Sequence, residues 1–131
     1  MIEESYVSFD TARMLKEAGF NIPCRGVYVT DRTGYYEFRE YDNKQTTNDL
    51  CWNADDGFQY EYLAPTQALA AKWLREIHGI DIVIDVIDEK DYCCDIFQNK
   101  QRKSIAESVK QSFEEVLEDG LKYALSLIKK Q

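Results

Sequence analysis

Three aspartates are placed where they could hold a metal ion. Asp81 and Asp85 have the spacing at which side chains share one face of a β-strand, and Asp95 lies on the next predicted strand. Carboxylate oxygens are the ligands that Mg²⁺ prefers, and an ion held by them could serve phosphodiester hydrolysis. Because the chain has 24 acidic residues, a solvated strand face would also produce this triplet. These aspartates are the candidate catalytic residues of one alternative, a metal-dependent nuclease or other hydrolase.

Tyrosines gather on the predicted strands between residues 27 and 62. Aromatic side chains on a sheet can stack unpaired bases, although Tyr and Phe are also common on any half-buried sheet. Acidic residues outnumber basic ones from residue 25 to residue 63, and an acidic aromatic face suits a protein partner better than RNA. The candidate partner-binding residues are Tyr35, Tyr60, Tyr62 and Trp52.

The main basic cluster contains Lys100, Arg102 and Lys103. It precedes a predicted helix, whose free backbone N–H groups could help these side chains to bind an anion. A polar linker would have the same composition. Lys72 and Arg75 share another helix face, which we interpret as solvated. Since the net charge of −8 repels phosphates, we do not expect nucleic acid among the partners.

Motifs of nucleophilic catalysis and phosphate binding are not found in the sequence. His78 is the single histidine, and no G-x-S-x-G or G-x-x-x-x-G-K-[ST] pattern occurs. The four cysteines (Cys24, Cys51, Cys93 and Cys94) contain no C-x-x-C pair. Cys93 and Cys94 are adjacent on a predicted strand and should point to opposite faces. We therefore expect reduced, partly buried cysteines that serve in packing, and no cofactor, and the assignment leans away from an enzyme.

Size and composition indicate one globular domain over residues 1–131. The chain is 44% hydrophobic and 31% charged, which is typical of a folded domain of this length. The opening residues lack a signal-peptide pattern, and the apolar runs are too short to cross a bilayer. The expectation is a cytoplasmic protein with no membrane association.

Two helices are indicated by start and stop signals. Ser8 is a good N-cap for the first helix, and Gly19 suits its end. The residues predicted to face inward are Phe9, Ala12, Leu15 and Ala18 or Phe20. The second helix is predicted to begin at Pro65 and to end at Gly79. Its predicted buried face consists of Leu69, Ala70, Trp73 and Ile77.

A third helix is predicted to begin at Ser104, where Ser104 and Glu107 match a capping box. An apolar stripe follows from Ile105 to Ile128. Gly120 lies on the inner side of this stripe. Because glycine costs about 1 kcal/mol against alanine in a helix, close packing against a neighbour is the expected reason for it.

Alternating residues predict strands around 27–38, with a hairpin turn at 31–34, and at 58–62, 80–86 and 92–98. The polar segment 43–57 is long for a loop, unless its apolar island around Leu50 forms a further short element. The fold class predicted is α+β, with three helices and a single antiparallel sheet of four to five strands, in the order α-β-β-(β)-α-β-β-α.

The stretch "APTQALAAKWLREIHGI" resembles a pattern in small uncharacterised proteins of gut Bacteroidetes and their prophages. Its A-P-[ST], W-L and H-G-I parts correspond to residues 64–66, 73–74 and 78–80. The stretches "YVSFDTARMLKEAGF" and "LEDGLKYALSLI" are similar to the ends of the same proteins. The resemblance implies a phage-derived accessory protein acting inside a bacterium, and it assigns no catalytic residue.

The leading functional hypothesis is a non-enzymatic interaction protein of a prophage or mobile element that binds a host or phage protein. It is motivated by the acidic charge, the many tyrosines, the segment 43–57 and the missing catalytic motifs. An acidic DNA mimic would be one form of it. The alternatives are the hydrolase described above and a nucleic-acid binder that uses the basic cluster. The sequence leaves the oligomeric state open.

Overall fold

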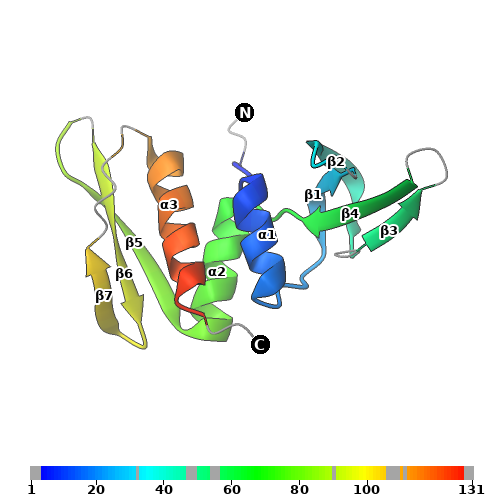
Figure 1. The fold of residues 1–131 in the computed structure, drawn as a ribbon. Coiled ribbons are helices and arrows are strands. Elements are labelled where there is room, and N and C mark those ends of the chain that lie inside the picture. Colours follow the sequence, from blue (N-terminus) through cyan, green and yellow to red (C-terminus); the bar gives the residue numbers. More distant parts are fainter. Residues whose placement is uncertain are drawn as a thin grey trace. The chain divides into compact units, whose positions relative to one another are not determined.

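The chain forms two compact units in the computed structural model (Figure 1). The structure describes residues 4–31, 33–46, 50–53, 57–89, 91–105, 110 and 112–128. We call Tyr6–Thr66 the N-terminal unit, and Gln67–Gln131 together with Met1–Ser5 the C-terminal unit. Each unit has its own sheet and is described by itself. That residues 1–131 form one globular domain stays a prediction.

The described residues of the N-terminal unit form one helix and a four-stranded antiparallel sheet. Its elements are α1 (Phe9–Glu17), β1 (Cys24–Thr30), β2 (Tyr36–Gln45), β3 (Leu50–Asn53) and β4 (Gly57–Leu63). The strand order is β2-β1-β4-β3. The sequence analysis allowed for a further short element around Leu50 in segment 43–57, and β3 is this element. Residues 47–49 and 54–56 of the segment lie outside the described part.

Local signals in the N-terminal unit act as predicted. Ser8 caps α1 by accepting a hydrogen bond from the Thr11 N–H. Gly19 follows the helix with φ +94°, which is the left-handed conformation that favours glycine. Gly34 has φ +92° in the β1–β2 turn. There the Asp31 carboxylate accepts hydrogen bonds from Thr33, which lower the pKa of Asp31.

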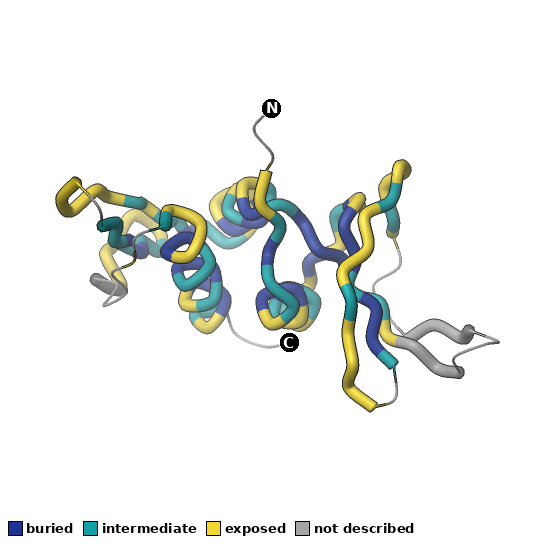
Figure 2. Tube along the Cα trace, turned by 90° about the horizontal axis from the view of Figure 1, so that it is seen from above, coloured by how far each residue is buried: buried dark blue, intermediate teal, exposed yellow. Residues whose placement is uncertain are grey.

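The described residues of the C-terminal unit form two helices and a three-stranded antiparallel sheet. Its elements are α2 (Gln67–His78), β5 (Ile80–Val86), β6 (Tyr92–Gln98), β7 (Gln101–Ile105) and α3 (Phe113–Ser126). The strand order is β5-β6-β7. Helix α3 packs on β5 and β6, and α2 packs against α3 and β5. Buried and exposed positions alternate along the helices (Figure 2).

Gly120 lies where α3 comes closest to the sheet. A methyl group on Gly120 would lie 3.0 Å from the Ile82 Cγ2 and 3.2 Å from the Cys94 Sγ. Ile80, Cys94 and Ile96 are fully buried in this layer. The prediction that Gly120 allows close packing against a neighbour is confirmed.

The prediction of a single sheet is wrong, although the α+β class with three helices in the described part is correct. Strands β1 to β4 pair among themselves, and β5 to β7 do the same. The extra strands β3 and β7, which each lie at one edge of their sheet, complete the pairing within each unit.

The predicted start of the last helix is also wrong. Ser104 lies in β7, where its backbone pairs with Ile96, and α3 begins only at Phe113. Ser112 is the observed N-cap and accepts a hydrogen bond from the Glu115 N–H. Ser112 and Glu115 have the same S-x-x-E spacing as the predicted capping box. The pairing of β7 with β6 therefore decides that the helix begins at the capping box of Ser112 and not at that of Ser104.

In helix α2, Trp73 is buried as predicted, but the buried face of the helix differs from the predicted one. Trp73 and Leu74 are buried, whereas Ile77 is 64% exposed, so the predicted inward position of Ile77 is wrong. The helix begins two residues after Pro65 with the buried Gln67, whose Nε2 donates to the Glu114 carbonyl and the Glu118 carboxylate. Among the described residues, no helix has both the length and the apolar character needed to cross a bilayer.

Candidate functional site

Six aromatic side chains form a continuous cluster in the N-terminal unit, which we call the aromatic surface. Its members are Phe9, Tyr28, Tyr36, Phe38, Tyr60 and Tyr62. The Phe9 ring, from α1, stacks on Tyr36 with 4.2 Å between centroids and 12° between planes. It also meets Tyr28 and Tyr62 edge-on, each at 5.6 Å. Phe9 therefore joins rings from three strands.

The strand register explains why these rings meet. Tyr28 on β1 pairs with Phe38 on one side and with Tyr62 on the other. Thr30, two residues later, pairs with Tyr36 and Tyr60. Directly paired residues, and residues two apart on a strand, point to the same face of a sheet. Two rows of side chains therefore share the face on which Phe9 lies.

Half of the aromatic surface is open to solvent. Tyr36, Tyr60 and Phe38 are 49%, 43% and 37% exposed. Tyr28 is anchored, since its hydroxyl donates a 2.7 Å hydrogen bond to the Val7 carbonyl. A large contiguous apolar patch on a protein surface often marks an interaction site. Three of the six rings are therefore exposed on a face that Phe9 and Tyr28 hold in place.

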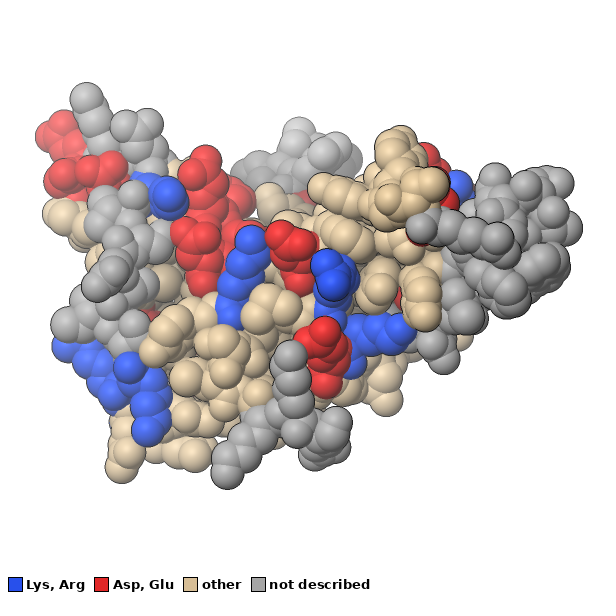
Figure 3. All heavy atoms as spheres, in the orientation of Figure 1, with Lys and Arg blue, Asp and Glu red and all other residues tan. Residues whose placement is uncertain are grey.

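Two cations of α1 lie over the aromatic surface. The Arg13 guanidinium is 5.7 Å from the Phe9 centroid, and the Lys16 ammonium is 5.2 Å and 5.1 Å from those of Tyr60 and Tyr62. Phe9, Arg13 and Lys16 fall on one side of the helix because an α-helix turns once in about 3.6 residues. Blue side chains on α1 adjoin the tan surface of this unit in Figure 3.

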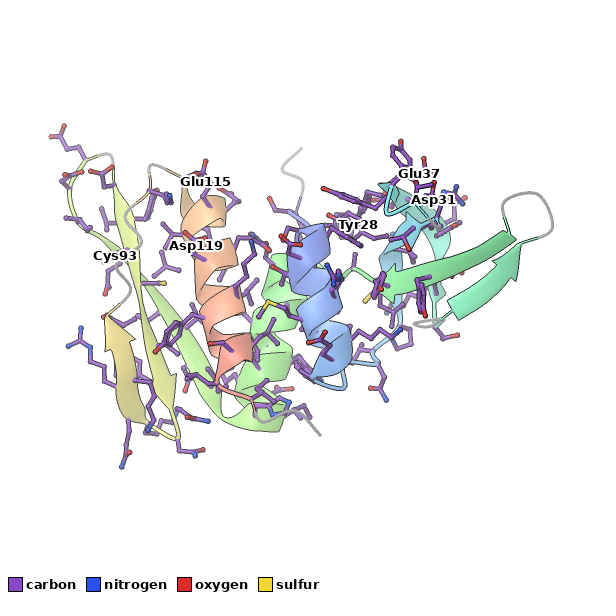
Figure 4. All side chains as sticks on the ribbon, viewed as in Figure 1. Tyr28, Asp31, Glu37, Cys93, Glu115 and Asp119 are labelled. Atoms are coloured by element: carbon purple, nitrogen blue, oxygen red, sulfur yellow. The ribbon has the colours of Figure 1, made fainter. Side chains whose placement is uncertain are left out.

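Several charged side chains that accompany the tyrosines in sequence belong to the opposite face of the sheet. Glu37 and Arg39 alternate with Tyr36 and Phe38 along β2, and Glu61 lies between the two tyrosines of β4 (Figure 4 labels Tyr28 and Glu37). The Glu37 carboxylate binds the Arg39 guanidinium at 2.6 Å and raises the pKa of Arg39. The excess of acidic over basic residues between residues 25 and 63 therefore does not describe the charge of the aromatic surface.

Tyr6 and Glu40 form one border of the aromatic surface. The Tyr6 ring lies 4.8 Å from the Phe38 ring and packs against Gly26. Burial raises the pKa of Tyr6, and so does the hydrogen bond between its hydroxyl and Glu40. The one acid that β2 places beside Phe38 on this face is thus engaged by a tyrosine.

The predicted partner-binding residues have different outcomes. Tyr60 and Tyr62 belong to the aromatic surface. Tyr35 lies in the turn before β2 and is 65% exposed. The backbone of Trp52 pairs with Phe58 in the β3–β4 ladder, but its side chain lies outside the described part. Three members of α1 (Phe9, Arg13 and Lys16) and three strand residues (Tyr28, Tyr36 and Phe38) were not among the predicted partner-binding residues. The i, i+4, i+7 spacing of Phe9, Arg13 and Lys16, which puts them on one helix face, was the available signal.

The three candidate catalytic aspartates share one face of the C-terminal sheet but do not form a metal site. Asp95 pairs with Val83, which lies between Asp81 and Asp85. Asp81 binds Lys100 at 3.3 Å, and Asp95 binds Arg102 at 3.0 Å. Among the residues that the structure describes, no three Asp, Glu, His or Cys side chains are grouped so that they could hold a metal ion. Two of the three carboxylates are thus engaged in surface ion pairs.

The basic cluster does not directly precede a helix, so the anion site at a helix N-terminus, an alternative to a polar linker, lacks its expected geometry. Lys100 lies in the turn between β6 and β7, and Arg102 and Lys103 lie on β7. Asn99 and Lys100 have φ of 52° and 68°, which closes this tight turn. Lys72 and Arg75 on α2 are exposed, as predicted.

Cys24 and Cys94 are buried packing residues, as expected, whereas Cys93 is half-buried. Cys24 and Cys94 are buried free thiols, and burial raises the pKa of each to about 11. Cys94 faces Gly120 of α3, so Cys93 belongs to the other face of the sheet (Figure 4 labels Cys93 on β6 and Asp119 on α3). The thiolate is the nucleophile, so thiols with a raised pKa react slowly near neutral pH.

His78, the last residue of α2, contacts the ring of Trp73 edge-on at 4.7 Å between centroids.

Comparisons with known proteins add no assignment. No protein-family model matches the chain, and no curated protein or solved structure is significantly similar to it.

Proposed function

We propose that this chain is a non-enzymatic interaction protein that binds another protein through the aromatic surface. The observation that carries the proposal is the cluster of exposed rings, Tyr36, Phe38 and Tyr60, on a face held in place by Phe9 and Tyr28. Tyrosine and arginine are enriched among the residues that dominate binding energy at protein interfaces. Rings fixed by neighbouring rings lose little conformational freedom on binding.

The proposed setting is a prophage or mobile element, in which the protein acts inside a bacterium on a host or phage protein. The resemblance of residues 64–80 to small phage-type proteins supports this setting. The hydrolase alternative has less support, because two of its three aspartates are paired with cations. A role based on Lys100 and Arg102 has less support for the same reason.

The test is quantitative affinity capture with the variant Tyr36→Thr/Tyr60→Thr. Threonine keeps the β-propensity of these strand positions but removes both rings. Truncating two central interface aromatics should weaken binding by tenfold or more, on the order of 1.4 kcal/mol. The full chain is tagged, partners from cells that express it are identified by mass spectrometry, and the amount captured is compared with wild type.

The matched control is Tyr123→Ala on α3, which removes a tyrosine of similar exposure, 40%, from the C-terminal unit. It should capture as much partner as wild type. Thermal unfolding of both variants shows that they remain folded. Equal capture by wild type and the Tyr36→Thr/Tyr60→Thr variant would contradict the proposal.

A further inference from the structure

We infer that the C-terminal unit carries a second docking surface, which takes a basic segment of a partner protein that also has apolar side chains. The surface consists of Val86, Tyr92 and Phe113, and we call it the hairpin surface because it lies at the β5–β6 hairpin. It belongs to a different unit from the aromatic surface, so the inference goes beyond the proposed function. A chain with both surfaces links two partners.

The first reason is an apolar position that α3 leaves uncovered. Ile82 faces Gly120 of α3, and alternation along β5 puts Val86 on the same face of the sheet. Exposure rises along this face, from the fully buried Ile80 to Val86, which is 69% exposed. Phe113 is the first residue of α3 and is itself 43% exposed. The apolar row of β5 therefore continues beyond the part that the helix covers.

Direct contacts join the three side chains into one surface. Val86 pairs with Tyr92 across the hairpin, and the Tyr92 ring meets the Phe113 ring edge-on at 6.0 Å between centroids. Backbone hydrogen bonds of 2.8 Å and 3.2 Å between Tyr92 and Lys110 hold the chain before α3 at this place. Ile87, which follows Val86 at the end of the hairpin, is 52% exposed. Connected apolar side chains on a protein surface often mark an interaction site.

The second reason is the charge around the hairpin surface, which decides the kind of partner. Residues 85–92 and residues 110–119 each contain four acids and one lysine, so together they have a net charge of −6, against −8 for the whole chain. This count includes both lysines. The hydrogen bond that Glu114 accepts comes from the neutral Ser112 hydroxyl, which leaves the charge in place. A segment with positive charge and apolar side chains is complementary to both features of this surface.

The basic residues of the same sheet are too far away to cancel this charge. Lys100 lies in the β6–β7 turn and Arg102 on the strand that follows it, and both are ion-paired. Strand β6 has seven residues, so its two ends are roughly 20 Å apart at about 3.3 Å per residue. The Debye length at physiological salt is only about 8 Å. In Figure 3, red side chains gather at the β5–β6 turn and blue ones at the β6–β7 turn.

The experiment measures binding of labelled polymers to the full chain by fluorescence anisotropy at about 150 mM NaCl, where screening leaves only local charge effective. The probes are poly(Lys,Tyr), polylysine and poly(Glu,Tyr). Wild type should bind poly(Lys,Tyr) more tightly than polylysine, because the tyrosines add apolar contact, and should not bind poly(Glu,Tyr). The variant Glu89→Lys/Glu115→Lys should weaken the binding of poly(Lys,Tyr) by about tenfold or more.

Two matched controls separate the hairpin surface from general properties of the chain. Asp42→Lys/Glu76→Lys makes the same change of net charge at exposed positions of β2 and α2, and it should bind poly(Lys,Tyr) within about twofold of wild type. Val86→Thr should weaken binding by about threefold or more, since a hydroxyl replaces a methyl group in the contact. Val83→Thr makes the same substitution on the other face of β5, at a side chain that is 41% exposed, and should leave binding unchanged. Circular dichroism verifies that all variants remain folded.

Three outcomes would overturn the inference. Equal loss in both charge variants would mean that poly(Lys,Tyr) responds only to the total charge of the chain. Equal binding by Val86→Thr and Val83→Thr would mean that the hairpin surface makes no apolar contact. A preference of wild type for poly(Glu,Tyr) would give the partner the opposite charge. Each of these outcomes leaves the proposed function in place, because the Tyr36→Thr/Tyr60→Thr capture tests that function separately on the N-terminal unit.

Discussion

Gly26 on β1 has no space for a side chain. A methyl group there would lie 2.7 Å from the Ala64 carbonyl oxygen and 2.7 Å from the Tyr6 ring. Gly26→Ala should therefore lower the free energy of unfolding by about 3 kcal/mol, the upper part of the range for overpacking. Urea denaturation measures the loss. Because Tyr6 borders the aromatic surface, we also expect weaker partner capture.

Gly120→Ala provides the comparison for this prediction. Its methyl group would meet side-chain atoms of Ile82 and Cys94 at 3.0 Å and 3.2 Å, which can shift more easily than a backbone carbonyl. Alanine also gains about 1 kcal/mol of helix propensity over glycine. We expect Gly120→Ala to cost clearly less than Gly26→Ala. A larger loss for Gly120→Ala would contradict this reading of the two contacts.

Helix α3 begins at the N-cap Ser112, although the sequence offers a second capping box earlier, at Ser104. Ser112→Ala removes the hydroxyl that accepts a 3.4 Å hydrogen bond from the Glu115 N–H. The free energy of unfolding should fall by roughly 0.5–1 kcal/mol, as for other N-caps. Ser104 lies in β7, so Ser104→Ala should not remove a helix cap. A loss in Ser104→Ala that exceeds the loss in Ser112→Ala would indicate that the helix begins at Ser104.

Elements bounded by local signals could be predicted from the sequence. The α1 cap at Ser8, the end at Gly19 and the turn at Gly34 each depend on neighbouring residues only. Strand β7 could not be predicted, because its pairing with β6 competes with a capping box that has equally good local chemistry at Ser104. The same limit applies to β3, a four-residue strand whose pairing with β4 is its main support.

The aromatic surface was only partly predictable for a related reason. Alternation indicates that Tyr60 and Tyr62 share a face, and so do Tyr36 and Phe38. Which rings meet across β1 depends on the order β2-β1-β4, and nothing local in the sequence sets this order. The placement of α1 on the same face, which brings Arg13 to the rings, is also a tertiary property.

At the scale of the whole molecule, net charge should dominate the response to salt. The chain carries −8 at pH 7, and self-repulsion of that kind opposes the folded state. The ion pairs of the described residues, such as Asp81–Lys100 and Glu37–Arg39, are at the surface and contribute little. Raising NaCl from about 10 mM to about 300 mM shortens the Debye length from roughly 30 Å to below 8 Å. The thermal midpoint should therefore rise by several degrees, measured by differential scanning fluorimetry.

The charge variants separate net charge from individual ion pairs. Asp42→Lys and Glu89→Lys, at exposed positions of β2 and of the β5–β6 turn, together reduce the net charge from −8 to −4, since each change adds +2. The double variant should gain less from NaCl than wild type does, because less repulsion is left to screen. A thermal midpoint of wild type that falls as NaCl rises would mean that specific ion pairs outweigh the net charge. The salt dependence would then have to be traced to pairs such as Asp95–Arg102.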